Sequence, residues 1–159
     1  MRPRSEDLSP AELRLLDDVE EQGVHVVHVP AAGEQPGHSY SVGLWESFGQ
    51  PEVLVFGLPE DIALDLINVV ADEADQGTQF AAGTRHAGLL QDYPVSLLDV
   101  PKALHGAFLQ KACWAYEGEE FPVVQLVWPD KQGRWPWEDG VRAGFRDAQP
   151  VLAMRPPLA

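Results

Sequence analysis

The sequence predicts an α+β fold, with one mainly antiparallel sheet of about five or six strands and three helices packed on it. Three observations lead to this prediction. Short apolar runs of strand length alternate with segments of helical periodicity, the first connections are too short for parallel crossovers, and no linker divides the 159 residues. A chain of this length can bury a core of its own. We therefore expect a single globular domain over residues 1–159, with irregular tails at 1–8 and 152–159.

The first expected helix follows Ser9. Ser9 is a favourable N-cap, Pro10 suits the first helical position, and Glu12 completes a capping box with Ser9. Gly23 is a favourable residue at which to end the helix. The apolar stripe expected to face the sheet is Leu13, Leu16 and Val19.

Three strands are expected next, at residues 24–29, 39–44 and 52–58. The third of them is apolar on both faces, which indicates a central position in the sheet. A turn at residues 31–37 and a short connection at residues 48–51 separate them. Connections of this length favour an antiparallel meander.

Two more helices are expected in the second half of the chain. One begins near Pro59 and ends near Gly77, and the other runs from about Pro101 to about Tyr116. The expected inward residues of these two helices are Ile62, Leu66, Val69 and Val70, then Leu104, Phe108, Ala112 and Ala115.

The remaining strands are expected at residues 79–82, 94–100 and 121–128. A glycine-containing loop at residues 83–88 separates the first two of these strands. After the last strand the chain forms an irregular, tryptophan-rich segment.

Composition and charge exclude several classes of protein. The net charge of −14 argues against binding to nucleic acid and to anionic membrane surfaces, both of which require clustered Lys and Arg. A solvated acidic coat explains the charge better than a partner selected by charge. The longest apolar run, residues 53–58, is too short to cross a bilayer, and no secretory signal precedes it. With Cys113 as the single cysteine, a cytoplasmic location is expected.

The histidines do not predict a metal site. His25 and His28 are three residues apart on an expected strand, so they point to opposite faces and cannot hold one ion together. Assembly of a site from His38, His86 and Asp130 would require three distant segments to meet. We therefore expect no bound metal.

The segment from Trp128 to Trp137, here called the tryptophan loop, is the most distinctive part of the sequence. It carries three of the five tryptophans, whose indole rings and N–H groups need partners. Asp130 and Arg134 are placed to close a turn with an ion pair, which we narrowly favour. Alternatively, Arg134 binds an anionic group while Trp128, Trp135 or Trp137 forms a stacking wall.

The strand at residues 39–44 has two unequal faces. His38, Tyr40 and Val42 share one face, whereas Ser39 and the residues in phase with it leave the other face small. A small face allows close approach by a helix, which we favour, or by a flat ligand such as a flavin. In the second case His38 and Tyr40 would lie at a pocket mouth.

Gln125 interrupts an otherwise apolar strand. A buried amide needs hydrogen-bond partners, so Gln125 either holds a loop backbone or lines a polar cavity. The first arrangement is the commoner one.

Two separated blocks of sequence resemble a bacterial family of unknown function, domain of unknown function 4262. The first block comprises residues 38–44 (His-Ser-Tyr-Ser-Val-Gly-Leu) and residues 48–58, which begin Phe-Gly-Gln-Pro-Glu. The second begins at residues 125–130 (Gln-Leu-Val-Trp-Pro-Asp) and ends with the Gln-Pro pair at 149–150. The resemblance covers roughly residues 20 to 151. It implies a single-domain bacterial protein and supplies no reaction.

Two positions depart from the family pattern. Gln50 stands where the family commonly has His, and Ser41 stands where it commonly has Thr. If the family His is catalytic, Gln50 puts activity of this chain in doubt. If that His is structural, Gln can substitute for it.

Two functional hypotheses follow. The first is a binding module that holds a small molecule or a protein partner, a second copy of the chain included, between the strand carrying Tyr40 and the tryptophan loop. Its expected ligand-binding residues are Tyr40, Gln125, Trp128, Arg134 and Trp137.

The second hypothesis is a small-molecule enzyme. His38 or His86 would act as the acid/base, Asp130 or Glu52 would orient it, and Arg134 would hold an anionic substrate. The reaction would be a cofactor-independent hydrolysis or isomerisation, or a flavin-type oxidation with the ring on the small serine face.

Overall fold

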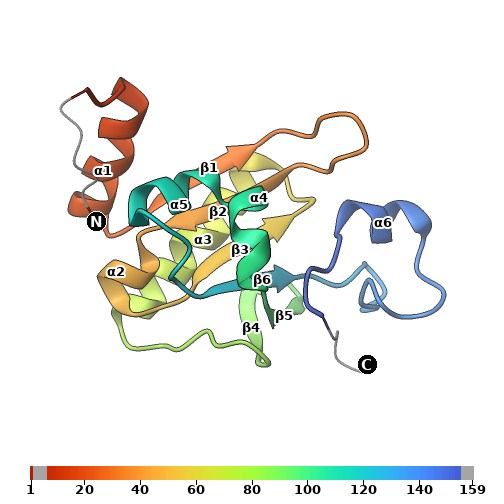
Figure 1. Ribbon diagram of the computed structural model, residues 1–159. Coiled ribbons are helices and arrows are strands. Elements are labelled where there is room, and N and C mark those ends of the chain that lie inside the picture. Colours follow the sequence, from red (N-terminus) through yellow and green to blue (C-terminus); the bar gives the residue numbers. More distant parts are fainter. Residues whose placement is uncertain (2–6, 155–159) are drawn as a thin grey trace.

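Among the residues that the computed structural model describes, residue 1 and residues 7–154, six strands form one sheet in the order β1-β2-β3-β6-β5-β4 (Figure 1). The strands are β1 (His25–Val29), β2 (His38–Val42), β3 (Glu52–Phe56), β4 (Arg85–Leu90), β5 (Tyr93–Asp99) and β6 (Val123–Val127). Neighbouring strands are antiparallel except β3 and β6, which are parallel. The predicted α+β fold with a mainly antiparallel sheet is confirmed.

The described helices are α1 (Pro10–Gln22), α2 (Leu44–Phe48), α3 (Glu60–Asp75), η1 (Lys102–Leu104), α4 (His105–Phe108), α5 (Gln110–Tyr116) and α6 (Ala143–Ala148). Two of the three predicted helices correspond to α1 and α3. The third is observed as η1 with α4 directly after it, and then α5. Leu109 separates α4 from α5, because its backbone leaves the helical conformation (φ −127°, ψ 52°) while its side chain is buried. The short helices α2 and α6 were not predicted.

The capping box of α1 is confirmed. The Ser9 hydroxyl accepts a hydrogen bond from the Glu12 N–H at 3.1 Å, and the Glu12 carboxylate accepts one from the Ser9 N–H at 2.9 Å. Gly23 ends the helix in the left-handed conformation. The buried stripe differs at one position, because Leu15 is buried whereas Leu13 remains 44% exposed.

The prediction of a strand at residues 79–82 is wrong. Phe80 lies in this segment without strand pairing, and the backbone N–H and carbonyl of Phe80 instead pair with the side chain of Gln50. The strand that pairs with β5 is instead β4, most of which lies in the segment expected to be a loop (residues 83–88). As an edge strand with largely exposed residues, β4 lacks the apolar pattern by which a buried strand is predicted.

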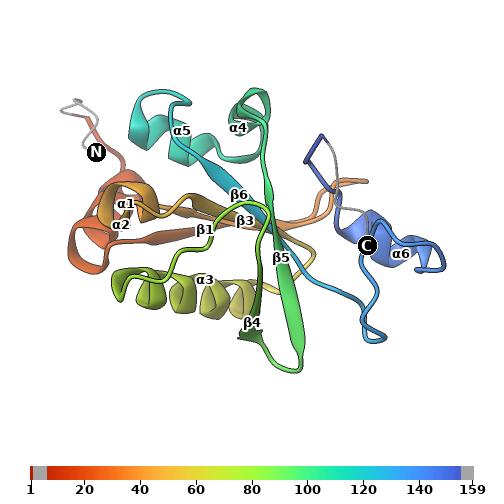
Figure 2. The same cartoon turned by 90° about the horizontal axis from the view of Figure 1, so that it is seen from below.

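Helices cover both faces of the sheet, as Figure 2 shows with α3 on one side and α4 and α5 on the other. Tyr40 and Leu54 belong to the hydrophobic cluster beneath α1, α4 and α5. Val53 and Leu126 belong to the cluster that faces α3. Neither α4 nor α5 extends over the β4–β5 hairpin, which the twist of the sheet turns steeply away from β1 and β3 (Figure 2).

The small serine face packs against the protein itself. Ser39 is 1% exposed and Ser41 is fully buried, and α3 lies against β2. This is the helix-on-sheet packing that we favoured, and it corrects the alternative in which a flat cofactor lies on this face.

A third hydrophobic cluster covers the face of β5 and β6 that α4 and α5 leave open. Leu98, Val127 and Trp135 form its buried part, and Val151 and Ala153 of the C-terminal region pack against it. The predicted tails include residues 2–6 and 155–159, which lie outside the described residues. None of the described helices is long and apolar enough to cross a membrane.

Candidate functional site

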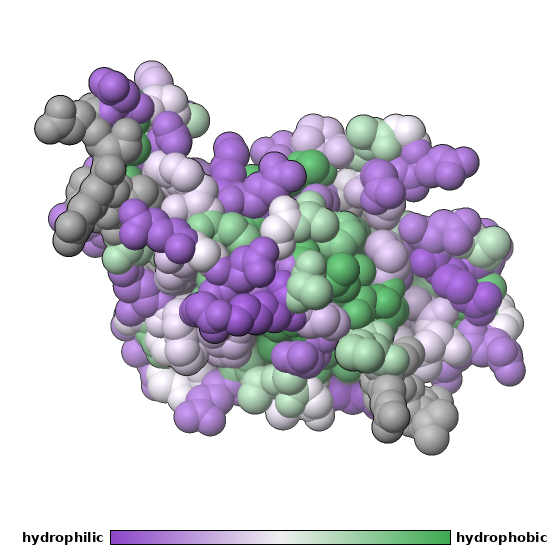
Figure 3. All heavy atoms as spheres, in the orientation of Figure 1, coloured by the Kyte–Doolittle hydropathy of each residue, from purple (hydrophilic) through white to green (hydrophobic). Residues whose placement is uncertain are grey.

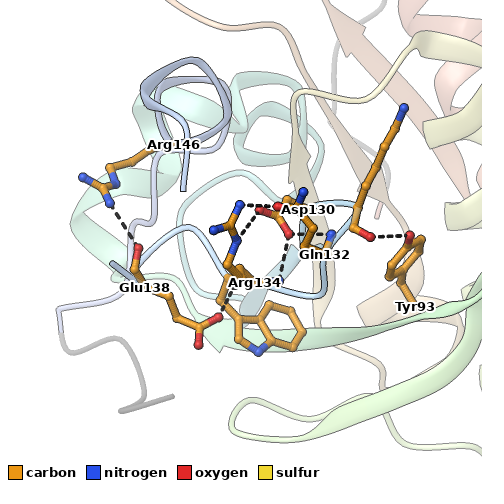
Figure 4. A network of polar contacts seen from close by, with 8 residues as sticks. Tyr93, Asp130, Gln132, Arg134, Glu138 and Arg146 are labelled. Carbon is orange, nitrogen blue, oxygen red and sulfur yellow. Dashed lines mark hydrogen bonds and ion pairs between the residues drawn. The ribbon is translucent and has the colours of Figure 1, made fainter. Parts of the chain in front are cut away.

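A network of hydrogen bonds closes the first turn of the tryptophan loop (Figure 4). Asp130 Oδ1 accepts from the backbone N–H groups of Gln132 and Arg134, both at 2.9 Å, and Asp130 Oδ2 accepts from Arg134 Nε at 3.1 Å. Desolvation raises the pKa of Asp130, but these hydrogen bonds outweigh it and lower the pKa below its ordinary value. The predicted turn with its ion pair is confirmed. It is tied to the β4–β5 hairpin by the Tyr93 hydroxyl, which donates to the Lys131 carbonyl at 2.9 Å.

The indole rings of the loop turn towards the protein's own core. Trp135 is 6% exposed and stacks on Trp137 with ring centroids 5.4 Å apart, while the guanidinium of Arg85 lies 4.8 Å from the Trp135 ring. The Trp128 indole N–H donates to the carbonyl of Phe56 at 2.9 Å. These contacts make the loop a cover for one end of the sheet.

His38 and Tyr40 are buried instead of lining a pocket mouth. The Tyr40 hydroxyl accepts a hydrogen bond from the Lys111 N–H at 3.0 Å, and burial raises the pKa of Tyr40 to about 12. His38 Nε2 lies 2.9 Å from the Phe108 carbonyl, which assigns the ring proton to Nε2, and burial lowers the pKa of His38. Trp128 packs against the cluster on the α3 side of the sheet, whereas Tyr40 faces α5. The structure therefore does not bring Tyr40 and Trp128 together around one site.

The other candidate residues are also hydrogen-bonded within the protein. His86 Nε2 lies 2.9 Å from the Thr84 hydroxyl, and its ring lies 4.7 Å from that of Phe80. His28 is bonded to Ser39 at 2.8 Å. Within the described part of the chain, no group of three or more His, Cys, Asp or Glu residues is arranged to hold a metal ion.

Two buried amides hold the segment at residues 150–154, here called the C-terminal segment, against the sheet. Gln125 Nε2 donates to the Pro150 carbonyl at 2.8 Å, and Gln125 Oε1 accepts from the Leu152 N–H at 2.9 Å. Gln149 makes a second such pair with the backbone of Trp128. Gln125 thus holds a loop backbone, the commoner of the two arrangements considered for it.

Glu52 is a fully buried carboxylate, which was expected from the sequence only to orient a histidine. It accepts hydrogen bonds from the Ser41 hydroxyl at 2.7 Å, the Tyr116 hydroxyl and the first N–H groups of α2. Those N–H groups belong to Gly43, Leu44 and Trp45, each 3.1 Å away. Desolvation raises the pKa of Glu52, and the hydrogen bonds oppose this effect. Desolvation also raises the pKa of Tyr116, as does the neighbouring Glu52 charge.

These bonds account for the position of Glu52 in an otherwise apolar strand. The Ser41 hydroxyl donates to the carboxylate, and its oxygen accepts from the Val53 N–H at 2.8 Å. Together these bonds hold the β2–α2–β3 connection in place. The bonds of Glu52 reach α2 and, through Tyr116, α5, whereas His38 and His86 are bonded to Phe108 and Thr84. The signal in the sequence is a lone acid in a strand that is otherwise buried on both faces.

A cavity of ≈ 680 Å³ lies between the β4–β5 hairpin and the C-terminal segment. Most of its wall is apolar, and Arg85, Ser96 and Asp99 supply its polar side chains. Figure 3 shows hydrophobic surface gathered in this part of the molecule, between α4 and α6. The lining residues are Ala82, Gly83, Arg85, Ser96, Leu98, Asp99, Pro101, Ala153 and Met154.

Sequence reasoning did not identify this cavity. Its β5 wall (Ser96, Leu98 and Asp99) lies in a predicted strand. Arg85, however, lies on β4, most of which was expected to be a loop, and the C-terminal segment lies partly in an expected tail. None of the predicted ligand-binding residues (Tyr40, Gln125, Trp128, Arg134 and Trp137) lines it. The tryptophan loop borders it through Trp135, whose ring contacts Arg85 and packs in one cluster with Leu98 and Ala153.

The fold and this cavity define an α+β protein with a concave, largely apolar site at one end of a six-stranded sheet. The profile of the domain of unknown function family DUF4262 matches residues 18–142. The chain therefore belongs to this family, as the two sequence blocks predicted. No curated protein and no solved structure matches the chain significantly.

Proposed function

We propose that the protein is a binding domain that holds a small molecule in the cavity between the β4–β5 hairpin and the C-terminal segment. The observation that carries this proposal is the lining, in which an apolar wall surrounds Arg85, Ser96 and Asp99. Small-molecule sites typically measure about 300 to 1,000 Å³ and combine apolar walls with a few polar groups. The cavity, at ≈ 680 Å³, has this size and composition.

The residues around the cavity favour binding over catalysis. General acid–base chemistry most often uses a histidine within hydrogen-bond reach of the reacting atoms. The nine lining residues include no histidine, cysteine or lysine, and their only acid is Asp99. His38 and His86, the acid/base candidates of the enzyme hypothesis, are bonded to Phe108 and Thr84 instead.

The expected setting of this binding domain is the bacterial cytoplasm, in line with the sequence resemblance and the single cysteine. A second copy of the chain as partner remains a separate prediction. It is tested by the native mass of the purified protein, which would be twice 17.5 kDa for a dimer.

A cavity-filling variant tests the proposal. In Ala153→Trp an indole would occupy the cavity, whereas Ala31→Trp adds the same side chain to the exposed β1–β2 turn and serves as the control. A library of small apolar compounds is screened by protein-observed NMR. We expect compounds that shift the Gly83 and Leu98 signals and bind Ala31→Trp like the wild type, but not Ala153→Trp. Compounds that bind Ala153→Trp as well as the wild type, or no binding compound at all, would contradict the proposal.

A further inference from the structure

We infer that the cavity selects a monocarboxylate with an apolar body, an inference that rests on the proposed function and specifies its ligand. Its basis is the pair formed by Arg85 and Ser96. The two residues are directly opposite each other on β4 and β5, so their side chains leave the sheet on the same side. Both line the cavity.

The guanidinium of Arg85 is positioned but not neutralised. It lies 4.8 Å from the ring of Trp135, which limits its movement, and Trp135 is itself stacked on Trp137. No carboxylate in the described part of the chain forms an ion pair with it. An arginine held in this way presents its N–H donors to an anion at little entropic cost.

Ser96 supplies a second donor at the same place. Its side chain is 97% buried (3% exposed), yet no described residue hydrogen-bonds to its hydroxyl. Ser96 lines the cavity, so its hydroxyl can donate to a ligand oxygen placed there. A ligand oxygen that accepts from both Ser96 and Arg85 would satisfy both groups.

The remaining wall determines the rest of the ligand. Leu98, Pro101 and Ala153 give an apolar surface on which an aliphatic or aromatic body can be buried. The carboxylate of Asp99 borders the same cavity and disfavours a second negative charge on the ligand. The net charge of −14 repels anions from the rest of the protein, so an anionic ligand needs the local donors of Arg85 and Ser96.

Octanoate, 1-octanol and octylamine test this inference because they share one apolar chain and differ in the head group. Affinities are measured by titration calorimetry for the wild type, Arg85→Gln, Ser96→Ala and the control Arg14→Gln, whose side chain is exposed on α1. We expect the wild type and Arg14→Gln to bind octanoate about tenfold more tightly than 1-octanol, because a charge-assisted hydrogen bond is worth this much. Octylamine should bind more weakly than either.

In Arg85→Gln the preference for octanoate should disappear while 1-octanol binding is retained. Ser96→Ala should weaken octanoate severalfold and leave 1-octanol unchanged, which gives an independent result if Arg85→Gln fails to fold. Equal wild-type affinities for octanoate and 1-octanol, or octanoate binding unchanged in both variants, would overturn the carboxylate inference and leave the cavity as a binding site. If none of the three compounds binds the wild type, both the inference and the proposed function fail.

Discussion

The side chain of Gln149 pairs with the backbone of Trp128 through both halves of its amide. Oε1 accepts from the Trp128 N–H at 3.1 Å, and Nε2 donates to the Trp128 carbonyl at 2.8 Å. The pair continues the hydrogen bonding of β6 by one residue beyond the strand. Together with Gln125, which binds the backbone of residues 150 and 152, it holds the C-terminal wall of the cavity in place.

Replacing Gln149 should therefore destabilise the protein. In Gln149→Ala both backbone groups of Trp128 lose their partner in a site where Gln149 is 1% exposed. We expect the free energy of unfolding to fall by about 2 to 3 kcal/mol, measured by urea denaturation. Gln76→Ala, at an exposed amide after α3, is the control and should change it by less than about 0.5 kcal/mol. Equal stability of the two variants would show that the pair contributes little.

Glu52→Gln should be more costly, because it replaces one acceptor oxygen by an N–H₂ donor as well as removing the charge. The carboxylate accepts five donors, from the backbone of residues 43–45 and from Ser41 and Tyr116. An amide N–H₂ group cannot accept, so at least two of these donors would face another donor. We expect a loss of about 3 kcal/mol in urea denaturation, against a negligible change for the exposed control Glu60→Gln. A stable Glu52→Gln protein would mean that the carboxyl group is protonated in the native state.

His38 should make stability depend on pH. Burial lowers the pKa of His38 below 6.5, the value expected for the unfolded chain. As the pH falls below 6.5, the unfolded chain gains the proton before the native protein does, so stability is highest above this pH and is lost towards the lowered pKa. His38→Gln can still donate to the Phe108 carbonyl but does not titrate. Urea denaturation at pH 7.5 and 5.5 should show a smaller loss on acidification for His38→Gln than for the wild type, and an equal loss would contradict this prediction.

Gln50 stands at the position where the family commonly has His, and its contacts here are structural. Gln50 Oε1 accepts from the Phe80 N–H at 3.0 Å, and Nε2 donates to the Phe80 carbonyl at 2.8 Å. The two nitrogens of an imidazole point in different directions and cannot serve both groups of one residue. We expect Gln50→His to lower the free energy of unfolding by about 1 to 2 kcal/mol, with the exposed Gln79→His as control. An unchanged free energy of unfolding in Gln50→His would show that the two residues are interchangeable at this position.

The parts of the fold that could be predicted from the sequence are those encoded locally. Ser9, Glu12 and Gly23 lie within one helix and its caps, and the apolar run of β3 predicts a central strand by itself. The Asp130–Arg134 turn is local in the same sense, since its partners are four residues apart. In each of these features the interacting residues are close in the sequence, so only a few local conformations have to be compared.

The candidate site depends on contacts between distant segments and could not be predicted in the same way. β4 carries exposed residues and is defined by its pairing with β5, as in the Arg85–Ser96 pair. The C-terminal wall depends on Gln149 and Trp128, which are 21 residues apart. A single sequence gives the residue types of such pairs but not which of them meet.

Arg134→Ala distinguishes the cavity from the tryptophan loop as the ligand site. The sequence suggested that Arg134 holds an anionic group, but in the structure its Nε is bonded to Asp130 and its side chain is 37% exposed. Because exposed ion pairs contribute little, the melting temperature should fall by no more than about 2 °C. If the ligand lies in the cavity, octanoate affinity should equal that of the wild type, since Arg134 does not line it. A loss of octanoate binding in Arg134→Ala, with Arg85→Gln unaffected, would instead place the anion at the tryptophan loop.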